Sequence, residues 1–281
     1  MRRVLDCFYP GSSFPAISVT GSSCALNCKH CSRKYLEGMM PALTPDDLIQ
    51  MAEVIAERGG RGFLLSGGVD SNGRLSLSDY IPAVQTIKET TDLKINAHIG
   101  LCPENEIPGL VRSGIDAFSV DVYGCDETIR EVLGLDARAD DYLRVVEGLV
   151  RNGAPLVAPH ICIGIHGGHL KGEQQAVEKL RSLAPRVLIL LSLIPTKGTP
   201  YASVPPPSKD DVLSIVHYAK ENLPTAKLVL GCMRSKLDRS SEAELVAAGL
   251  DGIVLPANST VEKLRAEGYT IRKSAMCCSF A

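Results

Sequence analysis

The sequence has no marked excess of charge of either sign. Its 281 residues include 30 basic and 32 acidic side chains, which give a formal net charge of -2. Nucleic-acid-binding surfaces carry a basic excess, so we expect no nucleic-acid partner. The chain also lacks a low-complexity linker. A hydrophobic content of 45% with 22% charged residues is typical of a globular protein with a substantial core.

Long apolar runs are missing as well. The N-terminal MRRVLDCFYP has two arginines but no apolar run long enough for a signal peptide, and no later run approaches the about 18 apolar residues of a membrane span. We therefore expect a cytoplasmic protein with no membrane partner. The ten cysteines, in a chain of this size without an export signal, indicate metal or redox chemistry in preference to a disulfide framework.

Short β-branched runs alternate with amphipathic stretches. Capping residues open two of the stretches, Thr44 before Pro45 and Ser208 before KDDVLSIV. Alternating strands and helices fit an open doubly wound sheet or a closed barrel, and a count of eight strands favours a TIM-like (β/α)8 barrel of the α/β class. The predicted strands are residues 16–20, 62–65, 94–99, 117–122, 156–165, 187–194, 227–230 and 253–255. The predicted organisation is an N-terminal extension (1–15), the barrel (16–268) and a short cysteine-bearing C-terminal tail (269–281).

Three cysteines follow the first predicted strand. Cys24, Cys28 and Cys31 have the spacing C-x3-C-x2-C, in a loop where barrel active sites lie. Three close thiolates can hold three corners of a cubane iron–sulfur cluster and leave the fourth iron open to a ligand. One alternative is a closed zinc site with His30 as the fourth ligand. Another is an electron-transfer cluster, which would want a fourth cysteine nearby.

This loop resembles the cluster-binding loop of the radical S-adenosylmethionine (SAM) superfamily, with His30 as the aromatic residue before the last cysteine. The resemblance implies a SAM-binding 4Fe-4S cluster, S-adenosyl-L-methionine as cofactor, and a reductant such as ferredoxin or flavodoxin. In that superfamily, reductive cleavage of SAM yields a 5'-deoxyadenosyl radical that abstracts hydrogen from the substrate. The protein positions the cofactor, which carries the chemistry.

Three more strand ends carry the same resemblance. Gly67 and Gly68 in SGGVD resemble the turn that binds the SAM amino group, although the glutamate often found next is absent. Alone, a double glycine is only a turn. Gly164 in HICIGIHGG resembles the strand that contacts adenine. Ile194 and Pro195 in LSLIPTKGTPY resemble the adenine-lining motif of the biotin and lipoyl synthase branch.

Polar side chains at strand ends are further candidates for binding SAM. Asp121 is the preferred one, because it ends an apolar strand that faces the expected cavity. Lys197 and Arg234 are candidates for contacting the SAM carboxylate or an acidic carrier protein. For the histidines among the remaining candidates, the alternative is an ordinary hydrogen-bonded structural role. Those candidates are His98, Tyr123, His160, His166 and His169. The sequence identifies no catalytic residue.

The C-terminal tail contains two adjacent cysteines, Cys277 and Cys278. They have no core to fill there, and a free exposed pair would oxidise. Cys232 ends the seventh predicted strand, and Cys7 precedes the first. We expect these cysteines to hold a second, auxiliary 4Fe-4S cluster.

An auxiliary cluster is the sulfur donor in one branch of the superfamily, so the chain resembles sulfur-inserting enzymes, and most of all a subunit of the two-protein lipoyl synthases. That resemblance implies lipoyl synthase (sulfurtransferase) activity on an octanoylated lipoyl-carrier protein or peptide, with a second radical SAM subunit as partner. The N-terminal auxiliary motif of single-protein lipoyl synthases is absent. The alternatives are a single-cluster enzyme of the biotin synthase-like branch, active in cofactor biosynthesis or metallocofactor maturation, and a non-enzymatic metal-binding module.

Overall fold

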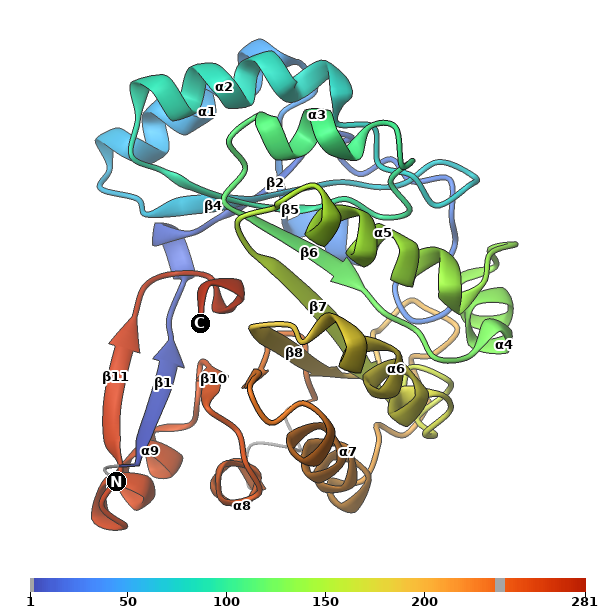
Figure 1. The fold of residues 1–281 in the computed structure, drawn as a ribbon, viewed down its shortest axis with the longest axis vertical. Coiled ribbons are helices and arrows are strands. Elements are labelled where there is room, and N and C mark those ends of the chain that lie inside the picture. The colour runs from blue at the N-terminus through green and yellow to red at the C-terminus, as the bar shows by residue number, and fades with distance from the viewer. Residues whose placement is uncertain (1–2, 236–240) are drawn as a thin grey trace.

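The computed structural model describes residues 3–235 and 241–281, in which a curled sheet carries helices on its outer, convex face (Figure 1). The sheet has 11 strands in the order β11-β1-β10-β9-β8-β7-β6-β5-β4-β2-β3, all paired in parallel. The strands are β1 (Val4–Phe8), β2 (Ala16–Ser18), β3 (Met40–Pro41), β4 (Gly62–Ser66), β5 (Lys94–His98), β6 (Ala117–Asp121), β7 (Val157–Ile163), β8 (Val187–Ser192), β9 (Lys227–Leu230), β10 (Gly252–Val254) and β11 (Thr270–Ser274).

Helices follow most of the strands. The α-helices are α1 (Pro45–Glu57), α2 (Ile81–Thr90), α3 (Ile107–Arg112), α4 (Asp126–Thr128), α5 (Ala139–Arg151), α6 (Glu173–Leu180), α7 (Lys209–Asn222), α8 (Glu242–Ala247) and α9 (Asn258–Ala266). The shorter turns are η1 (Gly11–Ser13), η2 (Lys34–Gly38), η3 (Ser78–Tyr80), the π-helical η4 (Ile129–Leu133), η5 (Arg181–Leu183) and η7 (Cys278–Phe280). The predicted caps at Thr44 and Ser208 are present, because each side chain accepts the N–H of the third helical residue.

The TIM-like α/β fold is confirmed, but full closure of the barrel is wrong. All eight predicted strands are present, and β1, β3 and β11 widen the sheet at its two ends. The edge strands β11 and β3 do not pair with each other in the described part of the chain, so the sheet curls without closing. The reason is that β1 pairs with β10 and β11, whereas β2, the next strand along the chain, pairs with β3 and β4.

Both termini take part in this sheet. β1 lies within the predicted extension, whose residues 1–2 are outside the described residues, and β11 lies within the predicted tail. These two strands pair in parallel, from Val4 opposite Thr270 to Phe8 opposite Ser274. The extension and the tail are therefore continuous with the barrel.

Side chains on the two faces of the strands form two separate apolar layers. The outer layer, between sheet and helices, includes Phe63, Ile95 and Phe118. The inner layer lines the curl and includes Val187 and Ile189. Burial on both faces is what an all-parallel sheet requires.

The last turn of the chain lies inside the curl of the sheet (Figure 1). Its Ser279 is fully buried, lying 3.2 Å from Asn96 Nδ2 and 3.1 Å from Ser119 Oγ. Asn96 and Ser119 come two residues before His98 and Asp121 on the inner faces of β5 and β6, so the tail lies below the strand ends. The C-terminus therefore forms the floor of the barrel interior.

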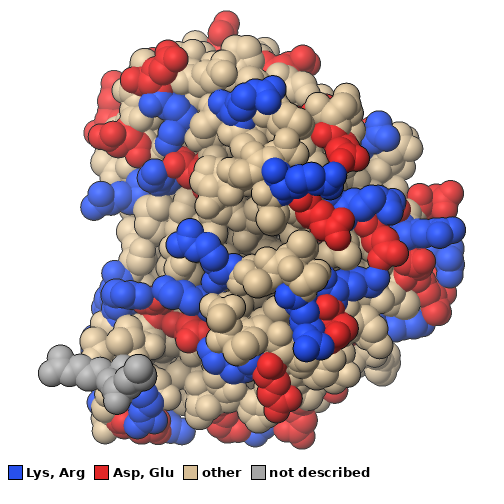
Figure 2. All heavy atoms as spheres, in the orientation of Figure 1, with Lys and Arg blue, Asp and Glu red and all other residues tan. Residues whose placement is uncertain are grey.

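Charged side chains of both signs are interleaved over the face drawn in Figure 2, with uncharged atoms between them. This agrees with the nearly balanced composition. Among the residues that the structure describes, no helix is both long and apolar enough to cross a membrane.

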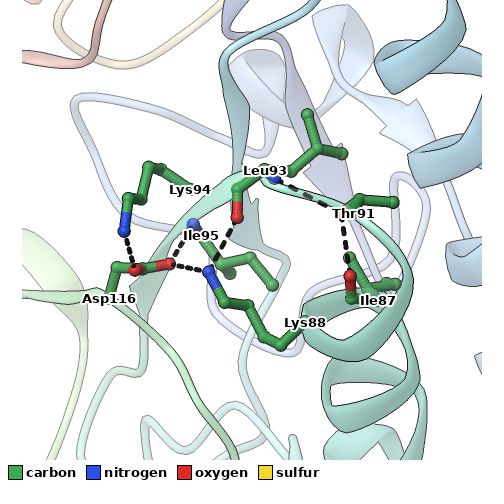
Figure 3. Close-up of polar contacts among 7 residues, drawn as sticks. All are labelled: Ile87, Lys88, Thr91, Leu93, Lys94, Ile95 and Asp116. Carbon is green, nitrogen blue, oxygen red and sulfur yellow. Dashed lines mark hydrogen bonds and ion pairs between the residues drawn. The ribbon is translucent and has the colours of Figure 1, made fainter.

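Asp116 ties the start of β5 to the end of α2 (Figure 3). Its carboxylate accepts hydrogen bonds from Lys88 Nζ at 2.7 Å, Lys94 Nζ at 2.7 Å and the Ile95 N–H at 3.0 Å. Burial alone would raise the pKa of Asp116, but these hydrogen bonds outweigh it and hold the pKa below its ordinary value. The contact fixes the strand that carries Asn96 and His98.

Replacing Asp116 by asparagine is expected to lower the free energy of unfolding by about 2 kcal/mol at pH 7, because charge-assisted hydrogen bonds are lost. Since the folded-state pKa is depressed, this stabilisation is present above the unfolded-state pKa of about 4 and is lost as pH falls through the folded-state value. Urea unfolding of the cluster-free chain at pH 7 and pH 3 measures the difference. The control is Asp140→Asn, which breaks an exposed pair with Lys179. An effect as small as that of the control at pH 7 would contradict the prediction.

Candidate active site

The cysteine triplet lies in the loop after β2, and other strand ends hold this loop in place. The Ala25 N–H donates to Val69 O at 2.8 Å, and the Lys29 N–H donates to Val132 O at 2.8 Å. The Tyr201 N–H donates to Lys29 O at 3.2 Å from the segment after β8. The backbone between the cysteines is thus fixed by three different parts of the barrel mouth.

The three thiols lie close enough to act on one another, as ligands of one cluster must. Each is half-buried, and the thiol pKa of Cys28 is raised to about 12, first by burial and then by the neighbouring Cys31 and Cys24. Backbone N–H groups point at two of the sulfurs, from Val69 to Cys24 Sγ at 3.4 Å and from Arg33 to Cys31 Sγ at 3.2 Å. Such hydrogen bonds tune the reduction potential of iron–sulfur clusters.

A closed zinc site fits the loop less well. Zinc–sulfur bonds of about 2.3 Å in a tetrahedron put the sulfurs about 3.8 Å apart. The one group of three metal-binding donors within 4.8 Å of one another, among the residues described, does not include any of these cysteines. His30, the suggested fourth ligand, does not decide the question, because its buried Nδ1 has no hydrogen-bond partner and burial lowers its pKa to about 4, which leaves a neutral ring able to bind a metal.

The double glycine packs directly against the cluster loop. A Cβ on Gly68 would lie 2.0 Å from Ser23 O and 2.5 Å from Cys24 Cβ, so only glycine fits there. The Gly68 N–H donates to Thr20 Oγ1 at 2.6 Å. Gly67 lies beside it, half-buried at the mouth. Thr20 was not singled out from the sequence, because nothing local to it indicates this contact.

Three further predicted SAM contacts lie just after β7 and β8. Ile194 and Pro195 follow β8 and are half-buried. The next residue, Thr196, shares a hydrogen bond of 2.9 Å between its Oγ1 and the hydroxyl of Tyr35, which follows the cysteine triplet. Gly164 is buried after β7 with φ +71°, and its N–H donates to Glu173 Oε1 at 2.8 Å. Burial raises the pKa of the Glu173 carboxyl. Glu173 was missed in the sequence, where it reads as an ordinary acidic residue starting a helix.

Polar groups line the interior between the mouth and the tail. The rings of His98 and His160 meet edge to face with centroids 5.0 Å apart, and His160 Nδ1 lies 2.9 Å from Ala158 O. Burial raises the pKa of Asp121, which lies close enough to Cys28 to act on its thiol. Burial lowers the pKa of His98, and it lowers the pKa of His160 to about 3. These groups form a polar belt beneath the cluster loop, in which burial disfavours the charged form of each side chain.

Three of the four cysteines predicted to hold a second cluster lie close enough to act on one another, although Cys278 is buried, Cys277 is half-buried and Cys232 is exposed. Cys277 Sγ lies 3.5 Å from Asn96 Nδ2. The pKa of Cys232 is raised, mainly by burial and to a smaller extent by the negative charge of a Cys277 thiolate. Cys278 packs on the inner apolar layer. Cys7 faces the other way, into the layer between sheet and helices, where burial raises its pKa to about 11. Cys7 is therefore apart from the other three.

Arg234 is not available to SAM or to a partner. Its guanidinium is buried against Glu242 Oε1 at 2.7 Å and also donates to Val254 O at 2.7 Å and Gly231 O at 2.8 Å. Lys197 and His169 are exposed. His166 lies beside Glu131, with 3.8 Å between Nε2 and Oε2, and Tyr123 stacks edge to face on Tyr142.

Comparison with known proteins agrees with this geometry. The family model described as the radical SAM superfamily matches residues 18–183, which include the cluster loop and the strands that surround it. This chain belongs to the radical SAM superfamily. Membership implies a 4Fe-4S cluster and SAM as cofactors.

The similar radical SAM proteins cover most of the chain at low identity. A biotin synthase from Ruthia magnifica is 21% identical over 84% of this chain and 74% of its own length. One from Acetivibrio thermocellus is 22% identical over 75% of this chain and 67% of its own length. These matches place the chain near the biotin synthase-like branch as a radical SAM enzyme, without separating sulfur insertion from related activities.

Solved structures share the fold. The [FeFe]-hydrogenase maturase HydG from Carboxydothermus hydrogenoformans matches with a TM-score of 0.68 at 19% identity, over 99% of this chain and 69% of that one. Methylornithine synthase matches with a TM-score of 0.63 at 14% identity, over 97% of this chain and 84% of that one. At such identities the likeness establishes the radical SAM fold alone.

Proposed function

We propose that this radical SAM enzyme inserts sulfur at an unactivated carbon of its substrate, with a second iron–sulfur cluster inside the barrel as the sulfur source. The observation that carries the proposal is that Cys277 and Cys278 lie on the inner apolar layer and that Cys232 is near enough to act on Cys278. Supporting it, the named relatives of the chain include biotin synthases.

Cys277 has the character of a metal ligand. The hydrogen bond with Cys278, followed by those with Ser279 and Asn96, lowers the pKa of Cys277 against the effect of burial, while the pKa of Cys278 is raised. Metal ligation needs the thiolate, and these hydrogen bonds favour it at Cys277. Cys232 keeps contact with solvent although protein surrounds its thiol, as expected of a side chain that lines a hollow.

The two ends of the barrel interior have different roles in this proposal: the strand ends hold the SAM-binding cluster, and the C-terminal tail holds the second cluster. The 4Fe-4S cluster at the triplet, when bound with SAM, supplies a radical able to abstract hydrogen from a C–H bond. The polar belt of His98, Asp121 and His160 orients the substrate between the mouth and the tail. The tail closes the floor against water, which a reactive radical site requires.

We extend the proposal to an octanoylated lipoyl-carrier protein or peptide as substrate, with a second radical SAM subunit as partner and ferredoxin or flavodoxin as reductant. The support is the resemblance of the segment LSLIPTKGTPY to the adenine-lining motif of the biotin and lipoyl synthase branch. The aliphatic inner layer does not add to it, because Val187, Ile189 and Val229 are fully buried against the tail.

The second candidate is a single-cluster enzyme of the same branch, acting in cofactor biosynthesis or metallocofactor maturation. It is favoured by the likeness to HydG and by the position of Cys7, which leaves only three of the four expected thiols together.

Iron and sulfide analysis of the anaerobically reconstituted chain separates the two candidates. Sulfur insertion predicts about eight irons per chain, falling to about four in Cys277→Ala. This variant should still cleave SAM to 5'-deoxyadenosine but add no sulfur mass to an octanoylated carrier peptide. Cys125→Ala, a half-buried cysteine outside both groups, is the control. About four irons in the unaltered chain would favour the single-cluster candidate.

A further inference from the structure

A group of metal-binding side chains lies outside the barrel interior, beside the support of the cluster loop. The donor atoms of Glu127, Glu131 and His166 all lie within 4.8 Å of one another. Glu127 and Glu131 are four residues apart in the continuous turn of α4 and η4, so their side chains share one face. His166 comes from the turn after β7. Short π-helical turns such as η4 are frequent at functional sites.

Thr128 orients the His166 ring. Its Oγ1 lies 3.2 Å from His166 Nδ1 and donates to the Lys171 carbonyl oxygen at 3.4 Å. A hydroxyl has a single proton, so while donating to Lys171 it accepts from the Nδ1–H. The Nε2 of the neutral ring then presents its lone pair toward Glu131, 3.8 Å away. Histidines that bind metals are held in this way, with the second ring nitrogen donating to a fixed acceptor.

One ammonium pairs directly with the group. Lys171 Nζ lies 2.6 Å from Glu127 Oε1, whereas Lys171 acts on Glu131, and Lys29 on His166, only at longer range. Among the described residues, the ion pairs of Glu131 include His166 and no lysine or arginine. The side chains of Glu127, Glu131 and His166 are 43%, 47% and 20% exposed, so a cation can enter directly from solvent.

The same turn supports the cysteine triplet. Val132 O accepts the Lys29 N–H at 2.8 Å, and Leu133 O lies 3.7 Å from Cys28 Sγ. An ion held by Glu127, Glu131 and His166 would therefore join η4 to the turn after β7 directly behind the cluster loop.

We propose that Glu127, Glu131 and His166 bind a divalent cation that takes mixed carboxylate and imidazole ligands, such as Mn²⁺ or Zn²⁺. The ion displaces the Lys171 ammonium from Glu127, and water completes its coordination. This site is separate from the cysteine triplet and from the tail cysteines, and it does not depend on the sulfur-insertion proposal.

Titration of the cluster-loaded chain with Mn²⁺, with free Mn²⁺ measured by electron paramagnetic resonance, tests the site. Mn²⁺ is the probe because it prefers oxygen and nitrogen donors to thiolates. We expect about one bound ion per chain, and at least about tenfold weaker binding in Glu131→Gln and in His166→Gln. Retention of the cluster absorbance checks that the variants fold. No saturable binding, or unchanged affinity in both variants, would overturn the proposal.

Lys171→Met gives a test that misfolding cannot imitate. Removing the competing ammonium should tighten Mn²⁺ binding by about two- to fivefold, the amount that an exposed ion pair contributes. Glu178→Gln, which breaks an exposed pair with Arg181, is the matched control and should leave the affinity unchanged. Weaker binding in Lys171→Met would count against the site.

Discussion

Replacing Cys28 by alanine is expected to remove the SAM-binding cluster and to bring 5'-deoxyadenosine formation down to background. The chain should lose about four irons, because two thiolates cannot hold a cubane with an open corner. The measurements are iron content, visible absorbance and product formation with SAM and dithionite. Cys125→Ala is again the control, since Cys125 lies outside the triplet. A Cys28→Ala chain that still cleaves SAM would show that the site is elsewhere.

The pH dependence of cluster assembly follows from the same geometry. Burial and the neighbouring thiols raise the pKa of Cys28 to about 12, so the free thiol is protonated at neutral pH. Iron must displace that proton, and assembly is therefore expected to weaken as pH falls.

Replacing Arg234 by methionine is expected to lower the free energy of unfolding by about 3–5 kcal/mol, because it leaves the Glu242 carboxylate buried without its cation. The two side chains are 4% and 0% exposed. Glu242 also accepts hydrogen bonds from the Ala257 N–H and from Thr260 Oγ1, both at 2.8 Å, so its charge is held in place by Arg234 and by the start of α9. Urea unfolding measures the loss.

Two further variants serve as the control and the rescue for Arg234→Met. Lys209→Met breaks an exposed pair with Glu244 and should cost no more than about 1 kcal/mol. The double variant Arg234→Met with Glu242→Leu should recover much of the stability, since neither charge then remains buried. An Arg234→Met chain as stable as Lys209→Met would contradict the assignment of a buried ion pair.

The ion pair of Arg234 and Glu242 also positions a cysteine proposed to bind the second cluster. Arg234 binds the carbonyl oxygens of Gly231 and Val254, which lie at the ends of β9 and β10. The residue after Gly231 is Cys232, whose position in the interior is thus set by a contact that the sequence does not indicate. The sequence predicts Arg234 as a SAM-binding cation at a strand end, whereas the structure pairs it with Glu242.

The sequence by itself determined the features whose signals are local. The spacing of Cys24, Cys28 and Cys31 predicts the cluster loop, because three ligands that lie within one short loop leave a local signal in the sequence. The period of the apolar runs located eight strands, and Thr44 and Ser208 located two helix starts, since each depends on neighbours in the chain.

Only the tertiary structure decided the open sheet, the burial of the tail and the surroundings of the ionisable groups. The contact between Asn96 and Ser279 spans 183 positions, and that between Asp6 and Arg272 spans 266. Cys7 and Cys232 are alike as cysteines near strand ends, yet the direction in which each strand presents its side chain sends one outward and the other inward. The physical reason is that partners so far apart in the chain leave no periodic trace, and a shift of one residue along a strand moves a side chain to the opposite face.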